Sequence, residues 1–141
     1  MARSGRHLAR RSAVQALYQW AMTEQPVEEI ESTFIHNENL SGKHKDYFDT
    51  LINVIPVHVE TIDQLIEPHL DRNAEKVDLL EQAILRLATY ELKFDPSIPT
   101  SVVLDEAIDL AKTFCSDHGY RFINGVLDKV AKQVRNDAHS V

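Results

Sequence analysis

The chain has 141 residues, of which 43% are hydrophobic and 26% charged, with only four glycines and five prolines. This balance excludes collagen-like, low-complexity and intrinsically disordered chains, and the length suits one ordinary folded domain. The formal net charge is -7, but residues 1–23 carry four arginines and no acidic residue, which leaves 11 basic and 22 acidic side chains in the rest.

Apolar residues recur at spacings of three and four along almost the whole chain, which predicts an all-α fold. The first helix is expected at about 6–22, a second at 27–38 and a loop at 39–42. A long amphipathic helix is expected at 45–66, and Pro56 should kink or divide it.

The polar stretch 71–75 separates this helix from the next, expected at 77–94. A further helix should run from Pro99 to about Cys115, and a last one over 120–135. We expect a flexible N-terminal arm at about 1–5 and a C-terminal tail at about 136–141. The pattern therefore predicts five to seven helices in a single domain, 1–141.

The first helix combines an apolar stripe with basic residues. At about 100° per residue, Arg6 and Arg10 fall on the same stripe as Leu17. Because a buried stripe cannot end in two unpaired arginines, we expect both guanidinium groups to project past the packed core. Together with Arg3 and Arg11, they would suit a phosphate-binding role, although a solvated terminal arm is the alternative.

One aromatic residue lies among these basic groups. Tyr18 shares a flank of the helix with His7 and Arg11. A ring beside guanidinium groups suits single-stranded RNA, whose unstacked bases lie on rings while phosphates meet arginine. The alternative is that Tyr18 forms a half-buried edge of the core.

Signatures of catalysis are absent from the sequence, which has no Gly-rich phosphate loop, G-x-S-x-G or H-E-x-x-H motif. The seven histidines lack paired ligand spacing and are interpreted as surface side chains rather than metal ligands. Cys115 is interpreted as a small buried side chain. With one cysteine, no apolar run of about 18 residues and no signal peptide, we expect a soluble cytoplasmic protein that is not an enzyme and has no cofactor.

Four blocks of sequence resemble the NusB family of transcription antitermination factors, in the order and spacing of that family. They are RHLARRSAVQALYQW (6–20), EQAILRLATYEL (81–92), IPTSVVLDEAIDLAKTF (98–114) and RFINGVLDKV (121–130). The resemblance implies an all-α domain of about six to seven helices arranged as two packed sub-bundles. It also implies binding of boxA-type single-stranded RNA together with the ribosomal protein NusE, as part of the RNA polymerase antitermination complex acting notably in ribosomal RNA synthesis.

The resemblance also implies positions for the site. The RNA side of the family matches Arg6 and Arg10, with Tyr18 alongside, and a second RNA-proximal patch matches Phe122 and Asn124. Glu81 matches a position on the NusE-facing side, for which a plain solvent-facing glutamate is the alternative.

Two other classes of function compete with this interpretation. A similar helical domain precedes the catalytic domain of some ribosomal RNA cytosine methyltransferases, so an rRNA-processing accessory domain related to it is one alternative. A complete methyltransferase is not expected, because no Gly-rich cofactor segment is present. A non-catalytic helical scaffold with solvated arginines is the other alternative. A homo-oligomer is possible, since an exposed apolar helix face would serve a second copy or the ribosomal partner equally well.

Overall fold

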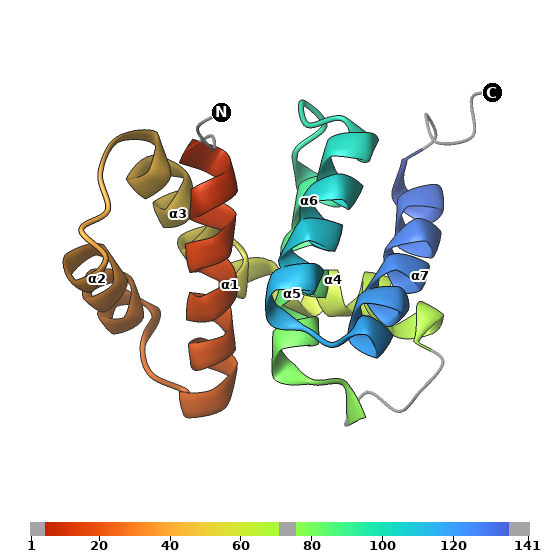
Figure 1. Ribbon diagram of the computed structural model, residues 1–141, viewed down its shortest axis with the longest axis horizontal. Coiled ribbons are helices and arrows are strands. Elements are labelled where there is room, and N and C mark those ends of the chain that lie inside the picture. Colours follow the sequence, from red (N-terminus) through yellow and green to blue (C-terminus); the bar gives the residue numbers. More distant parts are fainter. Residues whose placement is uncertain (1–4, 71–75, 136–141) are drawn as a thin grey trace. The chain divides into compact units, whose positions relative to one another are not determined.

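The computed structural model describes residues 5–70 and 76–135 (Figure 1). Within these ranges the chain forms seven α-helices, two short 3-10 helices and no strand, which confirms the all-α prediction. The chain divides after Val57 into two compact units, here called unit 1 (1–57) and unit 2 (58–141). The expected tail lies outside the described residues, as does the expected arm except for Gly5, which is already helical.

Unit 1 consists of α1 (Gly5–Thr23), α2 (Val27–Asn37) and α3 (Gly42–Val54). In Figure 1, α1 and α3 lie side by side, and α2 packs against both. The buried stripe of α1 is made mostly of small residues, whereas α3 and α2 contribute large ones. The core of this unit includes Ala9, Ala13, Val14, Leu17, Ile30, Phe48, Leu51 and Ile52. The small side chains of α1 bring its backbone close to α3.

A polar network joins the three helices of unit 1. The Ser12 hydroxyl on α1 donates a hydrogen bond of 3.1 Å to Glu38 Oε1, just after α2. The same hydroxyl lies 3.0 Å from His44 Nε2 on α3. These contacts fix the end of α2 and the start of α3 against one face of α1.

Pro56 divides the long helix predicted for 45–66, as expected. α3 ends at Val54, a 3-10 turn covers Pro56–His58, and α4 runs over Val59–Ile66. Proline removes one backbone donor and its ring clashes with the preceding turn, so the helix cannot pass through it. The boundary between the two units falls within this 3-10 turn.

Unit 2 contains α4, α5 (Leu79–Phe94), α6 (Thr100–Phe114) and α7 (Asp117–Val134), with a second 3-10 turn at Glu67–His69. α5 packs against α4, α6 and α7, which explains its near-continuous run of buried residues. A bidentate ion pair joins two of these helices, because Arg86 Nε and Nη2 lie 3.0 and 2.9 Å from the two carboxylate oxygens of Asp63.

Side-chain caps set the starts of two helices of unit 2, α5 and α7. Asp78 and Glu81 form a capping box, in which Asp78 Oδ1 accepts from the Leu80 and Glu81 amides and Glu81 Oε1 accepts from the Asp78 amide. Ser116 Oγ accepts from the Gly119 amide, so α7 begins three residues before the predicted Tyr120.

The end of the last helix is tied to the end of α5. α7 stops at Val134, and the next side chain, Arg135, is buried at 8% exposed. Its guanidinium group donates to the main-chain carbonyls of Glu91, Leu92, Asp95 and Ile98 and to the hydroxyl of Thr100. One of them, the Leu92 carbonyl, lies in the last turn of α5 and accepts from no backbone amide of the described residues.

Candidate nucleic-acid interface

The arginines of α1 differ in exposure. Arg6 and Arg11 are exposed, whereas Arg10 is only 3% exposed. The prediction that both stripe arginines project past the core is therefore correct for Arg6 and wrong for Arg10. Arg3 lies outside the described residues.

Tyr47 of α3 explains why a stripe can hold two arginines. The Arg6 guanidinium lies 4.4 Å from the centroid of the Tyr47 ring, and that of Arg10 lies 5.5 Å from it. The ring supplies the partner that the prediction lacked, because a guanidinium group is attracted to an aromatic face. Spacing along α1 alone could not reveal this residue, although its place beside the core residue Phe48 was a usable signal.

Two other expectations concern the flank of α1. Tyr18 is half-buried, which fits both an RNA-facing ring and an edge of the core. His7 is 5% exposed, so its interpretation as a surface histidine is wrong.

The second predicted patch lies on α7. Phe122 is half-buried and lines a shallow pocket of about 100 Å³ on unit 2, whereas Asn124 is exposed and does not line it. Two exposed basic side chains, Arg121 and Lys129, also line this pocket, and they lie eight residues apart on the same face of the helix. Neither basic residue was predicted as a site residue, although their spacing along the chain is visible in the sequence.

Glu81 is held by the cap of α5. It is 7% exposed, and its Oε1 accepts a hydrogen bond of 3.3 Å from the Asp78 amide. The solvent-facing alternative is therefore wrong. Gly119 of α7 lies so close to the Glu81 side chain that a Cβ on Gly119 would collide with Glu81 Oε2. A role of Glu81 in partner binding stays a prediction.

Cys115, at the end of α6, is set against the same carboxylates. Burial, together with the charges of Glu81 and Asp78, raises the pKa of its thiol to about 11. A thiol with this pKa is almost entirely protonated at neutral pH, whereas a nucleophilic cysteine needs a thiolate.

The predicted site residues thus fall into two groups. Arg6, Arg10 and Arg11 lie together at the start of α1 in unit 1, while Phe122, Asn124 and Glu81 lie in unit 2. Within the described ranges, no helix is long and apolar enough to cross a membrane.

Comparison with known proteins gives matches over nearly the whole chain. The model of the NusB family matches residues 7–132. The transcription antitermination protein NusB of Actinobacillus succinogenes is 46% identical over 128 residues, which cover 91% of this chain and 90% of that protein. The protein of the same name from Haemophilus ducreyi is 45% identical over 128 residues, covering 91% of this chain and 93% of its own.

Solved structures of NusB proteins also match this chain. A crystal structure of the antitermination factors NusB and NusE in complex with dsRNA contains a chain that matches with a TM-score of 0.85 and 28% identity, over 92% of this chain and 97% of that one. NusB from T. maritima matches with a TM-score of 0.85 and 30% identity over 100% of both chains. The matched length and the level of identity place this chain in the NusB family.

Proposed function

We propose that the protein is a transcription antitermination factor that binds boxA-type single-stranded RNA together with the ribosomal protein NusE. The pair would help RNA polymerase to resist termination, notably in ribosomal RNA operons. The observation that carries this proposal is the similarity to a NusB chain solved in complex with NusE and dsRNA. A role in transcription would place the protein in the cytoplasm.

The charges of the chain support an RNA-binding role for α1. Arg6 and Arg11 are exposed, and residues 1–23 contain no acidic side chain that would repel phosphate. The rest of the chain is acidic, which suits a basic ribosomal protein as partner. The pKa of the Cys115 thiol, raised to about 11, argues against this residue as a nucleophile.

The test is a titration of fluorescent RNA across a salt series. The RNAs are a boxA-type single strand, a scrambled strand and a boxA-type duplex, the last because the solved relative holds dsRNA. Each is titrated with the protein alone and with its cognate NusE. We expect NusE to tighten binding of the boxA-type single strand more than that of the scrambled one. Lack of saturable binding to any RNA would leave the scaffold alternative.

Variants locate the RNA contact. Arg6→Ala and Arg11→Ala should each weaken binding of all RNAs and reduce the slope of log affinity against log salt by about 0.7. Lys93→Ala is the matched control, because it removes an exposed positive charge from the last turn of α5. Equal effects of the three substitutions would contradict the assignment of α1 as the RNA side.

The proposed role of Glu81 in binding NusE is tested with a variant that keeps the cap of α5. Glu81→Gln removes the charge but keeps an oxygen that can accept from the Asp78 amide. We expect it to weaken the gain that NusE gives without changing binding to RNA alone. An unchanged gain would discard Glu81 as a partner-binding residue.

A further inference from the structure

An open pocket of about 600 Å³ lies in unit 1, where the first turn of α1 meets the first two turns of α3. It is lined by Gly5, Arg6, Lys43, Asp46, Tyr47 and Thr50. Its volume is within the range of small-molecule sites, about 300 to 1,000 Å³. Of these residues only Arg6 belongs to the set implied by family resemblance.

Gly5 lets the two helices approach at this place. A Cβ on Gly5 would lie 2.8 Å from Lys43 Cβ and 3.0 Å from the His44 amide nitrogen, closer than real side chains allow. The absence of a side chain therefore brings Arg6 and Lys43 to the same pocket, from two helices that are far apart in sequence.

Arg6 forms a supported but exposed cation. Tyr47, at 8% exposed, lies beneath its guanidinium group, 4.4 Å from ring centroid to guanidinium carbon, while Arg6 itself remains exposed. A guanidinium group held over one ring can stack on a nucleobase with its other face. Because the ring limits its motion, less side-chain entropy is lost on binding.

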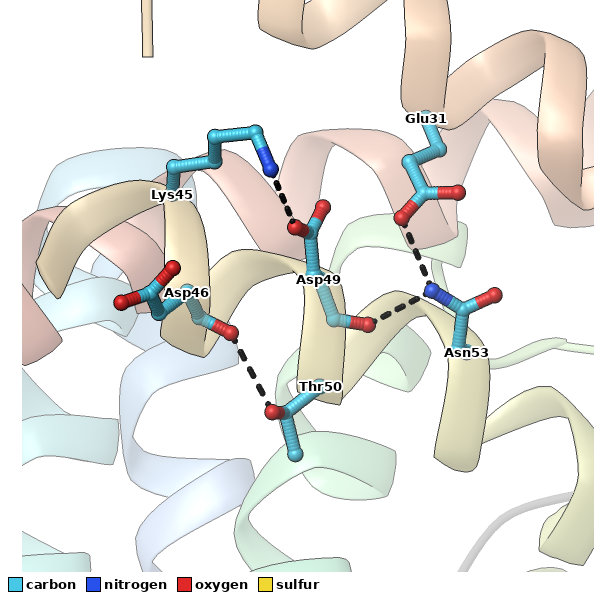
Figure 2. Close-up of polar contacts among 6 residues, drawn as sticks. All are labelled: Glu31, Lys45, Asp46, Asp49, Thr50 and Asn53. Carbon is cyan, nitrogen blue, oxygen red and sulfur yellow. Dashed lines mark hydrogen bonds and ion pairs between the residues drawn. The ribbon is translucent and has the colours of Figure 1, made fainter. Parts of the chain in front are cut away.

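The pocket also offers one anion and a second cation. In Figure 2, Lys45 is directed to Asp49, and its Nζ lies 2.8 Å from Asp49 Oδ2. The main-chain carbonyl of Asp46 accepts from the Thr50 hydroxyl, and the Asp46 carboxylate acts on Lys45 through its charge alone. Among the described residues, no side chain pairs with the Asp46 carboxylate or with the Lys43 ammonium. Both are exposed and available to a ligand.

The two cations and the carboxylate of this pocket fit a nucleotide better than a free anion. A carboxylate repels phosphate, so Asp46 must meet a hydrogen-bond donor, while Lys43 can meet a phosphate. Guanine offers two parallel N–H donors on its Watson–Crick edge, which match the two oxygens of a carboxylate. Uracil offers one donor flanked by two carbonyl oxygens, which the carboxylate would repel.

We propose that this pocket is a subsite for one guanine nucleotide of bound RNA. The base stacks on the outer face of Arg6, its N–H donors reach the Asp46 carboxylate, and a phosphate contacts Lys43. The inference rests on the RNA-binding function proposed above and adds to it a preference for guanosine at one flank of the bound segment.

The test uses the full chain and the boxA-type RNA extended at one end, then at the other, by three guanosines or three uridines. We expect the guanosine flank at one end to bind about tenfold more tightly than the uridine flank. Asp46→Asn should bring this ratio close to one, whereas Lys43→Ala should weaken binding of both flanked RNAs. Asp105→Asn is the matched control, since it removes an exposed carboxylate from α6 and should leave the ratio unchanged.

The outcomes separate this proposal from the proposed function. If the boxA-type RNA binds but neither end shows a guanosine preference, or if Asp46→Asn keeps the full ratio, the subsite is wrong and RNA binding stands. If none of these RNAs binds saturably, both proposals fail. Circular dichroism of each variant checks that the helices are retained.

Discussion

Arg135 Nε donates a hydrogen bond of 2.9 Å to the main-chain carbonyl of Leu92, so the residue after α7 holds the last turn of α5. The planar guanidinium group reaches four carbonyls at once, which the single ammonium of a lysine cannot do. Buried carbonyls left without donors are costly.

We therefore expect Arg135→Lys to lower the free energy of unfolding by about 3 kcal/mol, even though the charge is kept. Urea unfolding followed by circular dichroism measures the change. Arg121→Lys, the same substitution at an exposed position of α7, should be close to neutral. Similar losses for the two variants would mean that the carbonyl contacts do not stabilise unit 2.

Two glycines of α7 should respond in opposite ways to alanine. A Cβ at Gly119 would collide with Glu81 Oε2 and lie 3.2 Å from Cys115 Cβ, whereas a Cβ at Gly125 meets nothing within 4 Å. We expect Gly119→Ala to destabilise by about 1 to 3 kcal/mol through overpacking. Gly125→Ala should stabilise by about 0.5 to 1 kcal/mol, because glycine is a poor helix former. Thermal unfolding of the two variants measures both changes. Stability changes of the same sign for Gly119→Ala and Gly125→Ala would contradict this account.

A carboxyl pair between α2 and α3 should make stability depend on pH. Burial, and then a hydrogen bond with the Asp49 carboxyl, raise the pKa of Glu31 above its ordinary value of 4.5. The folded state therefore favours protonated Glu31, and this contribution is full below pH 4.5 and lost as the pH rises through the folded pKa.

Glu31→Gln imitates the protonated form and keeps an oxygen for the hydrogen bond of 2.8 Å that Asn53 donates (Figure 2). Relative to the unchanged protein, we expect the variant to gain stability as the pH rises from about 4 to 7, by less than about 1 kcal/mol. Denaturant unfolding at several pH values measures this. Glu29→Gln, on the exposed side of the same helix, is the control, and a parallel trend for both would discard the carboxyl pair as the cause.

The thiol of Cys115 should be unreactive while unit 2 is folded. With a pKa of about 11, only about one thiol in a thousand is ionised at pH 8. We expect native protein to react with a disulfide reagent at least about a hundredfold more slowly than protein unfolded in guanidinium chloride. Native and unfolded rates within a factor of about ten would refute the raised pKa.

Helix positions could be predicted because each depends on local spacing and on breaking residues. Pro56 and the pair Asp95-Pro96 mark helix boundaries in the sequence itself, and α5 ends at Phe94 as predicted. The starts of α3 and α7 were predicted three residues late. Their first turns are polar, and it is Ser41 and Ser116 that precede them, so apolar periodicity began only afterwards.

The site was less predictable because its geometry depends on contacts between helices. Exposure of Arg10 was predicted from α1 alone, but the side chain is buried and lies beside the Tyr47 ring of α3. Glu81 was placed by resemblance, while its burial in the cap depends on Asp78 and on the passage of Gly119. Such pairings across helices have no signature in one sequence.

The tie between Arg135 and the end of α5 also sets an order of events during synthesis. All three helices of unit 1 lie within the first 57 residues, so they are synthesised before any helix of unit 2 and this unit can fold on the nascent chain. The Leu92 carbonyl at the end of α5 waits for a donor that is 43 residues further along the chain, or roughly 2 to 9 seconds at ordinary elongation rates. We expect unit 1 to be formed, with Arg6 already over Tyr47, while unit 2 is still incomplete.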